Sequence, residues 1–391
     1  MKKNVKSIFN FFRGYYFLLL LYFFKKRKIK NAEIVFFFPF YHTGGAEKVH
    51  SQIVAALQVK KCIVIFTQGS ATTNFLKKFK ANATVIEINS IVNKKNDWIN
   101  QKLKCLLYST INQSNTIQTI FSSNSPYFYN LLSYLNPDLK IIDLYHSFSQ
   151  NDSREKQLID SAIRINKRIV ISQKTKRDII SYYNKNNINQ ELIKRIEVIE
   201  NAVMVPEILD NKTNKNMVIG FVGRWSEEKR PEVFLSIANM IQIEFPEIEF
   251  VMAGSGIVSN YEVIQENGVK YLGDLFEENQ IIELYRKIDL LLLPSVYEGF
   301  PMVIMEAMSY GVIPIATDVG GISEHLQNNT NGILIENSSD EFHLATQFVK
   351  IIKMLVREGY VRDRMSKNAF EYAQNNFDIE QFNKSYQELL N

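Results

Sequence analysis

Two cations lie five residues apart where an apolar run ends. Arg224 and Lys229 follow residues 217–222, on what reads as a strand-to-helix loop. Arginine binds phosphate oxygens through two parallel hydrogen bonds and lysine acts as a point charge, so the pair suits a diphosphate. Because Glu227 and Glu228 nearly cancel the two cations, a solvated charged loop is the alternative interpretation.

Two carboxylates lie around a second loop. The apolar run at 290–293 leads into a loop that contains Glu298, Gly299 and Pro301, and Glu306 follows in the expected helix. The neighbours of Glu306 are mostly apolar, and a carboxylate in such surroundings needs a hydrogen-bond partner, which sugar or ribose hydroxyls would supply. The alternative is that Glu298 is an ordinary turn residue and Glu306 an exposed helical one.

Composition excludes several other classes of site. The chain has 391 residues, which suits two domains, and 46% hydrophobic with 22% charged residues is typical of globular proteins. Cys62 and Cys105 are its two cysteines, so a disulfide framework or a cysteine zinc site is excluded. The five histidines lack zincin spacing, and no Gly-x-Gly-x-x-Gly motif indicates a dehydrogenase. We therefore expect no metal site.

Positive charge is concentrated at the N-terminus. Residues 1–30 contain nine Lys or Arg and no acid, and removing these nine charges from the net +5 leaves −4 for the rest. Nucleic acid is therefore not an expected partner. The apolar stretch 8–24 precedes the basic run 25–28, which argues against a cleaved signal peptide. We expect residues 1–30 to associate with an anionic membrane face, either lying on it or spanning it. The alternative is a helix packed on the protein.

Strand and helix patterns alternate in two series, which predicts an α/β fold with parallel sheets. In the first series we expect strands at 34–38, 62–67, 84–88, 116–122, 140–145 and 168–172, with helices at 48–57 and 174–183. After a polar, turn-rich stretch at 206–216, we expect strands at 217–222, 248–253, 269–272, 290–293 and 313–316, with helices at 231–243, 277–286 and 301–310. Two tandem Rossmann-like, doubly wound domains with a cleft between them follow from this order.

The expected domains are four. Residues 1–30 form the membrane-associating segment, 31–208 a first Rossmann-like domain, and 209–375 a second Rossmann-like domain. Residues 376–391 form a C-terminal helix, which we expect to pack back on the first of these domains.

The run SVYEGFPMVIMEAMSYG at 295–311, together with Gly223, Arg224 and Lys229, resembles the family 4 retaining glycosyltransferases of GT-B fold, glycosyl transferases group 1. The likeness is most specific at 290–325 and looser in the first domain. There the loop 44–47 resembles the family's glycine loop.

The resemblance implies that 31–208 is the acceptor-side domain and 209–375 the nucleotide-sugar-binding domain. It also implies roles for individual residues. Arg224 and Lys229 would neutralise the departing diphosphate, Glu298 would contact the donor sugar, and Glu306 the ribose. His146 would face the donor sugar; the alternative is a structural histidine whose hydrogen bonds are made within the protein. His42 is a weaker candidate for the sugar-facing role. Implied donor-binding residues are Gly44, Gly45, Gly223, Gly254, Gly299, Phe300, Pro301, Met302 and Glu306.

The sequence also departs from the family pattern. Arg230 stands where the family usually has glycine, and we expect it either to add a third cation or to point to solvent. Glu200 and Ala202 replace the usual Pro and Gly before the linker. Glu324 matches a family position that we expect to be structural, at a helix start.

The implied activity is retaining transfer of a hexose or N-acetylhexosamine from a UDP- or GDP-sugar to a glycan acceptor, with no cofactor and no metal. The basic, apolar N-terminus favours a lipid-linked acceptor at the cytoplasmic face of the cell membrane, hence surface polysaccharide, lipopolysaccharide or glycolipid synthesis. Two alternatives remain open: a nucleotide-sugar epimerase of the same shape, and a non-catalytic nucleotide-sugar-binding scaffold.

Overall fold

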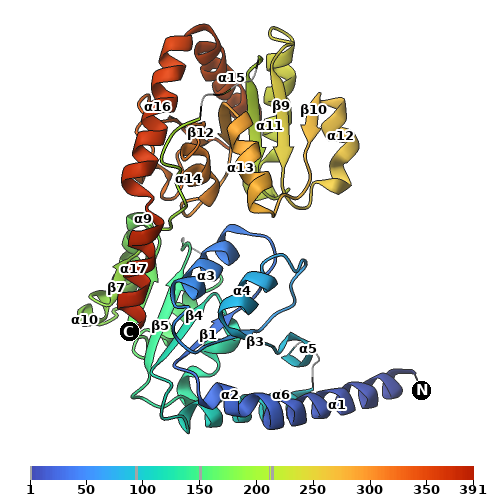
Figure 1. Ribbon diagram of the computed structural model, residues 1–391, viewed down its shortest axis with the longest axis vertical. Helices are drawn as coiled ribbons and strands as arrows, with labels where there is room; N and C mark the ends of the chain where they lie inside the picture. The colour runs from blue at the N-terminus through green and yellow to red at the C-terminus, as the bar shows by residue number, and fades with distance from the viewer. Residues whose placement is uncertain (1, 93–95, 149–151, 211, 213–214) are drawn as a thin grey trace. The chain divides into compact units, whose positions relative to one another are not determined.

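The chain forms two compact units. The structure, a computed structural model, describes residues 2–92, 96–148, 152–210, 212 and 215–391 (Figure 1). The first unit comprises Met1–Val170, Lys176–Ile199 and Asn383–Asn391, and the second Ile171–Thr175 and Glu200–Phe382.

The first unit is built on a parallel sheet of seven strands in the order β3-β2-β1-β4-β5-β6-β7. These strands are β1 (Ile34–Phe38), β2 (Cys62–Phe66), β3 (Thr84–Glu87), β4 (Thr119–Ser123), β5 (Lys140–Tyr145), β6 (Lys167–Val170) and β7 (Ile196–Val198). The helices are α1 (Lys2–Leu20), α2 (Lys26–Lys30), α3 (Gly45–Ala56), α4 (Leu76–Asn82), α5 (Asn89–Val92), α6 (Asp97–Asn112), α7 (Pro126–Tyr129), α8 (Glu155–Asp160), α9 (Gln173–Lys185) and α10 (Gln190–Ile193).

The central strands are buried on both faces. Every residue of β1 is buried, which explains why this strand is a continuous apolar run without alternation. On one face, Val35 and Phe37 pack in a cluster with Leu103 and Leu107 of α6.

The N-terminal helix packs on this unit by one face only. α1 continues through a π-helical turn, η1 (Leu21–Lys25), into α2, and it runs beside α6 (Figure 1). Gly14 lies against Ile99 of α6, and Leu21 and Ile29 are buried. Elsewhere the segment exposes Phe12, at 63%, and the further aromatic residues Tyr15, Tyr16, Tyr22, Phe23 and Phe24. The segment therefore packs on the protein, which is one of the two sequence-based interpretations, and it also keeps exposed aromatic residues. Its association with a membrane stays a prediction. Within the described residues, no helix combines the length and hydropathy that a bilayer-spanning segment requires.

The second unit has a parallel sheet of six strands in the order β10-β9-β8-β11-β12-β13. The strands are β8 (Val218–Val222), β9 (Glu249–Ala253), β10 (Val269–Tyr271), β11 (Leu290–Leu293), β12 (Ile313–Thr317) and β13 (Ile333–Ile335). The α-helices are α11 (Pro231–Gln242), α12 (Tyr261–Glu266), α13 (Glu278–Lys287), α14 (Met302–Met308), α15 (Glu341–Arg357), α16 (Gly359–Asn376) and α17 (Ile379–Leu390).

Local signals explain where these helices begin. Pro231 starts α11, where its missing N–H leaves no hydrogen bond unmade. Asp340 caps α15 by accepting a hydrogen bond from the backbone N–H of His343. α11 and α15 then pack together over one face of the sheet, where Phe234 and Phe348 join a common cluster with Phe250 of β9.

The predicted α/β class with two Rossmann-like sheets is confirmed. The short edge strands β7 and β13, of three residues each, were not predicted. At the C-terminus, the last residues of α17 lie in the first unit, where Tyr386 packs against Phe121 and Lys140 donates a hydrogen bond to the carbonyl of Leu389.

Candidate functional site

The second sheet reverses its winding direction between β8 and β11. The chain leaves β8 towards β9 and β10 on one side, and β11 leads to β12 and β13 on the other. Loops that follow two such strands lie next to each other at the carboxyl edge, which is where open α/β sheets bind ligands. The two loops are joined directly, because the backbone N–H of Val296 donates to the carbonyl of Glu228 over 2.8 Å.

These adjacent loops bring Lys229 and Glu298 together. Lys229 Nζ lies 2.5 Å from Glu298 Oε1, and Ser295 Oγ donates to the same oxygen over 2.8 Å. The Glu298 side chain is buried, and that of Lys229 is 18% exposed. The ammonium is therefore fixed at the switch point by a buried carboxylate but still reaches solvent. It is placed to meet an anion.

Arg224 takes a different position on the same loop. Its side chain is 59% exposed, and one guanidinium nitrogen lies 3.0 Å from Glu228 Oε1. An ion pair this exposed is weak, so the guanidinium can leave it at little cost. The structure thus pairs Lys229 with Glu298 and leaves the side chain of Arg224 exposed to solvent.

Arg230 contradicts both sequence-based expectations, because it is neither a third cation of the site nor a solvent-facing residue. It is buried, with a backbone φ of 49° in the left-handed region, where glycine is the usual residue. Its guanidinium donates to Asn337 Oδ1 over 2.7 Å and to the Ser338 carbonyl over 2.9 Å. The physical reason is burial: a buried guanidinium needs acceptors, and the loop at 337–338 supplies them. Arg230 therefore holds that loop against the start of α11.

Glycines allow the site loops to approach each other. Gly254 has a φ of 138°, and a Cβ there would lie 1.9 Å from the Gly223 carbonyl oxygen. A Cβ on Gly320 would lie 1.7 Å from the Glu298 carbonyl oxygen. The backbone N–H of Gly321 donates to the Gly299 carbonyl, 2.6 Å away. A side chain at Gly254 would push away the backbone of Gly223, and one at Gly320 the backbone that carries Glu298.

The predicted donor loop 299–302 leads into α14. The Phe300 ring is buried, 4.3 Å from the His325 ring between centroids, so its side chain is part of the core. Pro301 precedes Met302, the first residue of α14. Further along α14, Glu306 accepts a hydrogen bond from Tyr285, Oη to Oε2, over 3.0 Å. Burial and the nearby Glu306 carboxylate raise the pKa of Tyr285, which keeps its hydroxyl a donor. Glu306 thus has a protein partner in addition to any ligand hydroxyl.

The first unit pairs His146 with a histidine that the sequence did not single out. His146 follows β5, and its Nε2 lies 2.9 Å from Nε2 of His50 on α3. His50 is fully buried and its ring stacks on Phe38 at 4.2 Å. Burial lowers the pKa of His146 to about 4 and holds the pKa of His50 well below its usual range. Both rings are therefore neutral near pH 7, and one must donate to the other.

The hydrogen bonds of His50 indicate which tautomer His146 adopts. His50 Nδ1 is buried without a partner among the described residues. A bare nitrogen there costs less than a buried N–H without an acceptor, so the His50 proton belongs on Nε2. His146 then accepts at Nε2 and carries its own proton on Nδ1, which becomes a fixed donor.

The glycine loop lies at the start of α3. Gly44 caps this helix in an extended conformation and Gly45 is its first residue. The buried Glu47 carboxylate lies close to Gly44, and Glu47 Oε1 is 3.7 Å from His42 Nε2. Strand order places this loop, which follows β1, beside the residues that follow β4, at the switch point of the first sheet.

Sequence reasoning did not single out three further residues at these sites. His50, Ser295 and Tyr285 have no motif of their own, and their spacing to partners on other elements is irregular. Glu324 was expected to be structural, at a helix start. It accepts hydrogen bonds from the backbone N–H groups of Gln173 and Lys174, so the helix that it caps is α9. The described residues contain no group of three or more His, Cys, Asp or Glu side chains placed to hold a metal ion.

The chain has two Rossmann-like sheets, and the second sheet carries a candidate site at its switch point. Two such sheets are typical of the GT-B fold, and solved structures confirm this fold. The Anabaena protein HepE, in complex with UDP and glucose, matches with a TM-score of 0.71 at 18% identity, covering 92% of this chain and 99% of that chain. A glycosyltransferase from Rickettsia africae matches with a TM-score of 0.69 at 18% identity, covering 92% of this chain and 98% of that one. At this identity the likeness establishes the fold alone.

Comparisons by sequence find matches in the second unit. Residues 207–372 match the model of glycosyl transferases group 1. An Escherichia coli protein named UDP-Gal:alpha-D-GlcNAc-diphosphoundecaprenol alpha-1,3-galactosyltransferase is 32% identical over 200 residues, which cover 48% of this chain and 49% of the relative. An uncharacterised glycosyltransferase of Methanocaldococcus jannaschii is 28% identical over 187 residues, 43% of this chain and 46% of the relative. The chain thus spans about half the length of these curated relatives.

Proposed function

We propose that the protein is a retaining glycosyltransferase that moves a hexose or N-acetylhexosamine from a UDP- or GDP-sugar to a lipid-linked glycan. The observation that carries this proposal is the Lys229–Glu298 pair at the switch point of a glycosyl transferases group 1 domain. A buried carboxylate holds an ammonium where a ligand diphosphate would lie, so the cation is in position before the donor binds.

The proposed chemistry assigns a role to each residue. The bond between the anomeric carbon and the diphosphate oxygen breaks, and the acceptor hydroxyl oxygen bonds to that carbon on the same face. The acceptor proton goes to the leaving phosphate oxygen, so atoms and charge balance. Lys229 and Arg224 stabilise the charge that develops on the diphosphate, which is the largest contribution expected. Glu298 positions the donor sugar, and Glu306 the ribose.

His146, in the first unit, is proposed to contact the donor sugar. With Nε2 engaged by His50, its Nδ1–H is the group free to donate to a sugar hydroxyl. Because its pKa is about 4, His146 is neutral at pH 7 and acts as a hydrogen-bond donor without adding positive charge.

The proposed acceptor and location rest on the N-terminal segment and on one relative. The printed name of the E. coli relative specifies a diphosphoundecaprenol-linked acceptor. Residues 1–30 combine an exposed aromatic face with nine cationic residues, which suits a helix lying on an anionic membrane. We therefore place the protein at the cytoplasmic face of the cell membrane, in the synthesis of a surface polysaccharide, lipopolysaccharide or glycolipid.

A transfer assay tests this function. The purified full chain is incubated with each of UDP-galactose, UDP-glucose, UDP-N-acetylglucosamine and GDP-mannose, with N-acetylglucosamine diphosphate-linked polyprenol as acceptor. One donor should give a product lengthened by one sugar with the donor's α configuration at its anomeric centre. An isomerised donor without any transfer would support the epimerase instead, and a β-linked product would contradict retention.

A metal-free reaction is part of the proposal, since Lys229 and Arg224 carry the charge that a divalent cation would otherwise neutralise. Transfer measured after dialysis against EDTA should stay within about twofold of the untreated rate. A loss that added Mg²⁺ or Mn²⁺ restores would overturn this part of the proposal.

A further inference from the structure

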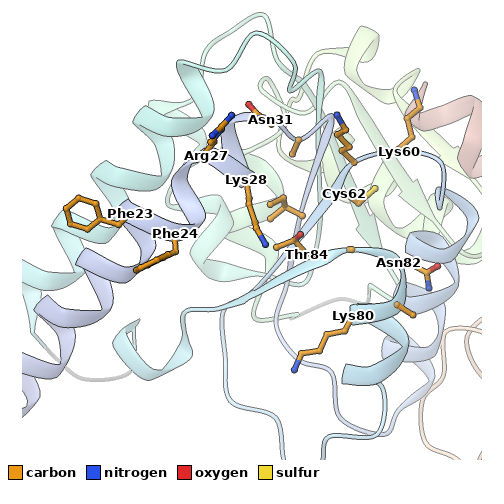
Figure 2. Close-up of a pocket in the computed structure, with 15 residues that line it drawn as sticks. Phe23, Phe24, Arg27, Lys28, Asn31, Lys60, Cys62, Lys80, Asn82 and Thr84 are labelled. Atoms are coloured by element: carbon orange, nitrogen blue, oxygen red, sulfur yellow. The ribbon is translucent and has the colours of Figure 1, made fainter.

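A basic pocket opens at the amino ends of the first three strands of the first unit. It has a volume of about 720 Å³ and lies where β1, β2 and β3 begin, between α2 and the end of α4 (Figure 2). The proposed donor-binding loops follow the carboxyl ends of β1 and β5, at the opposite edge of the same sheet. The basic pocket is therefore separate from the site for glycosyl transfer.

Cations dominate the walls of the basic pocket. Its lining contains five basic residues and no Asp or Glu: Arg27, Lys28, Lys60, Lys61 and Lys80. Among the described residues, the carboxylate in contact with them is Glu33. It lies 3.9 Å from Lys60 Nζ, and it also accepts a hydrogen bond from the backbone N–H of Lys61. One half-exposed carboxylate leaves most of this charge uncompensated. Like charges around one hollow repel each other, so an anion bound there relieves the repulsion.

Two phenylalanines lie beside these cations. Phe23 and Phe24 line the same pocket and are 68% and 67% exposed. They extend the exposed aromatic face of α1, which carries Phe12 and Tyr16. A small soluble anion would satisfy the lysines but would leave these rings in water. A phospholipid satisfies both, because its phosphate binds cations while aromatic rings enter the boundary with the acyl chains.

We propose that the basic pocket binds the phosphate of an anionic phospholipid headgroup, with Phe23 and Phe24 inserted beside it at the acyl boundary. This inference rests on the membrane association in the proposed function and adds a binding site outside residues 1–30. Lys60, Lys61 and Lys80 come from other parts of the first unit, so the site forms only when that unit is folded. It directs the amino-terminal edge of the first sheet towards the bilayer.

Vesicle binding by full-length variants tests the pocket. The test variant is Lys60→Gln/Lys61→Gln/Lys80→Gln, which leaves residues 1–30 intact. The control is Lys156→Gln/Lys185→Gln/Lys194→Gln, which removes the same charge from exposed positions elsewhere in the first unit. Each protein is sedimented with phosphatidylcholine vesicles and with vesicles that also contain about 30 mol% phosphatidylglycerol, an anionic content chosen to give a negative surface potential.

The wild type should bind the anionic vesicles and not the neutral ones. Each lysine near such a surface adds to the attraction, so the test variant should lose about tenfold or more in partition coefficient, and the control less than about twofold. Phe23→Ser/Phe24→Ser should also weaken binding. The proposal would be overturned if the wild type and the test variant bound anionic vesicles equally well. It would also be overturned if the test and control variants lost the same amount of vesicle binding.

Two further measurements separate this inference from the proposed function. Transfer to a water-soluble acceptor glycoside should be the same in the wild type and the test variant, because the pocket lies at the opposite edge of the sheet. If neither protein transfers a sugar, the proposed glycosyltransferase activity is overturned. The vesicle experiment then still decides whether the basic pocket binds lipid. A third outcome is possible: millimolar inorganic phosphate raises the thermal midpoint of the wild type but not of the test variant, and neither protein binds vesicles. This result would overturn lipid binding and favour free phosphate as the ligand of the pocket.

Discussion

Lys229 Nζ lies 2.5 Å from Glu298 Oε1, although 69 positions separate the two residues in the chain. The pairing follows from topology, since one residue follows β8 and the other follows the neighbouring strand β11. The family resemblance in the sequence assigns Lys229 to the diphosphate and Glu298 to the donor sugar. In the structure each also fixes the other, so their substitutions should not be independent.

A double-mutant cycle on this pair checks that dependence. Lys229→Ala should lower the transfer rate by about 100-fold or more, since a cation facing the transition-state charge is removed. Glu298→Gln keeps an acceptor for Ser295 and should reduce kcat more than it weakens nucleoside diphosphate binding. The double variant should be less impaired than the product of the two single effects. Effects on kcat that multiply without coupling would show that the two side chains act separately.

Arg224 should matter for transfer and hardly at all for folding. Arg224→Ala should reduce the transfer rate by about 100-fold or more, while the thermal midpoint moves by no more than about 2 °C because the side chain is exposed. Glu228→Gln is the matched control, because it removes the ion-pair partner and leaves the cation. A near-normal rate for Arg224→Ala would remove this residue from the mechanism.

Arg230 should contribute stability through the loop that it holds. Both Arg230→Gly and Arg230→Ala lose the hydrogen bonds to Asn337 and Ser338. Glycine relieves the left-handed backbone, whereas alanine keeps its cost, so the glycine variant should be the more stable by about 1 kcal/mol. Urea unfolding of the two variants measures the difference. Equal stability would mean that the left-handed conformation is not retained in the alanine variant.

The His50–His146 pair should make the first unit sensitive to acid. The pKa of His146 falls from about 6.5 in the unfolded chain to about 4 in the folded one, and burial also lowers the pKa of His50. Between pH 4 and 6.5 the unfolded chain binds more protons than the folded chain. The free energy of unfolding is therefore highest above about pH 6.5 and declines as the pH drops towards 4. Each histidine should add up to about 1.4 kcal/mol per pH unit to this slope.

Unfolding measured across that range in His50→Gln tests the assignment. Glutamine retains an N–H at a similar reach but does not titrate, so the slope should decrease while folding persists. His343→Gln, at an exposed position on α15, is the control and should leave the slope unchanged. The same slope in wild type and His50→Gln would contradict the buried neutral pair.

Much of the fold could be predicted from sequence, because its signals are local. Continuous apolar runs such as Ile34–Phe38 and Leu290–Leu293 are β1 and β11, and Pro231 marks the start of α11. What could not be predicted depends on neighbours distant in sequence. Asp143 and Arg168 look like interruptions of apolar strands. They lie directly opposite each other on β5 and β6 and form a buried ion pair at 2.9 Å.

The candidate site divides in the same way. Spacing predicts that Lys229 and Glu298 follow two strands, but only strand order makes them neighbours. No sequence pattern shows that Arg230 is buried, since its acceptors come from residues 337–338, more than a hundred positions away. His50 is similarly hidden, because its partner His146 lies 96 positions along the chain.

Calorimetric titration of UDP and GDP into the wild type and Lys229→Ala tests the central claim most directly. One of the two nucleotides should bind the wild type. Loss of one charge-assisted contact to the diphosphate should raise its Kd about tenfold or more in the variant. Equal Kd values for the two proteins would contradict the claim, as would a wild type that binds neither nucleotide.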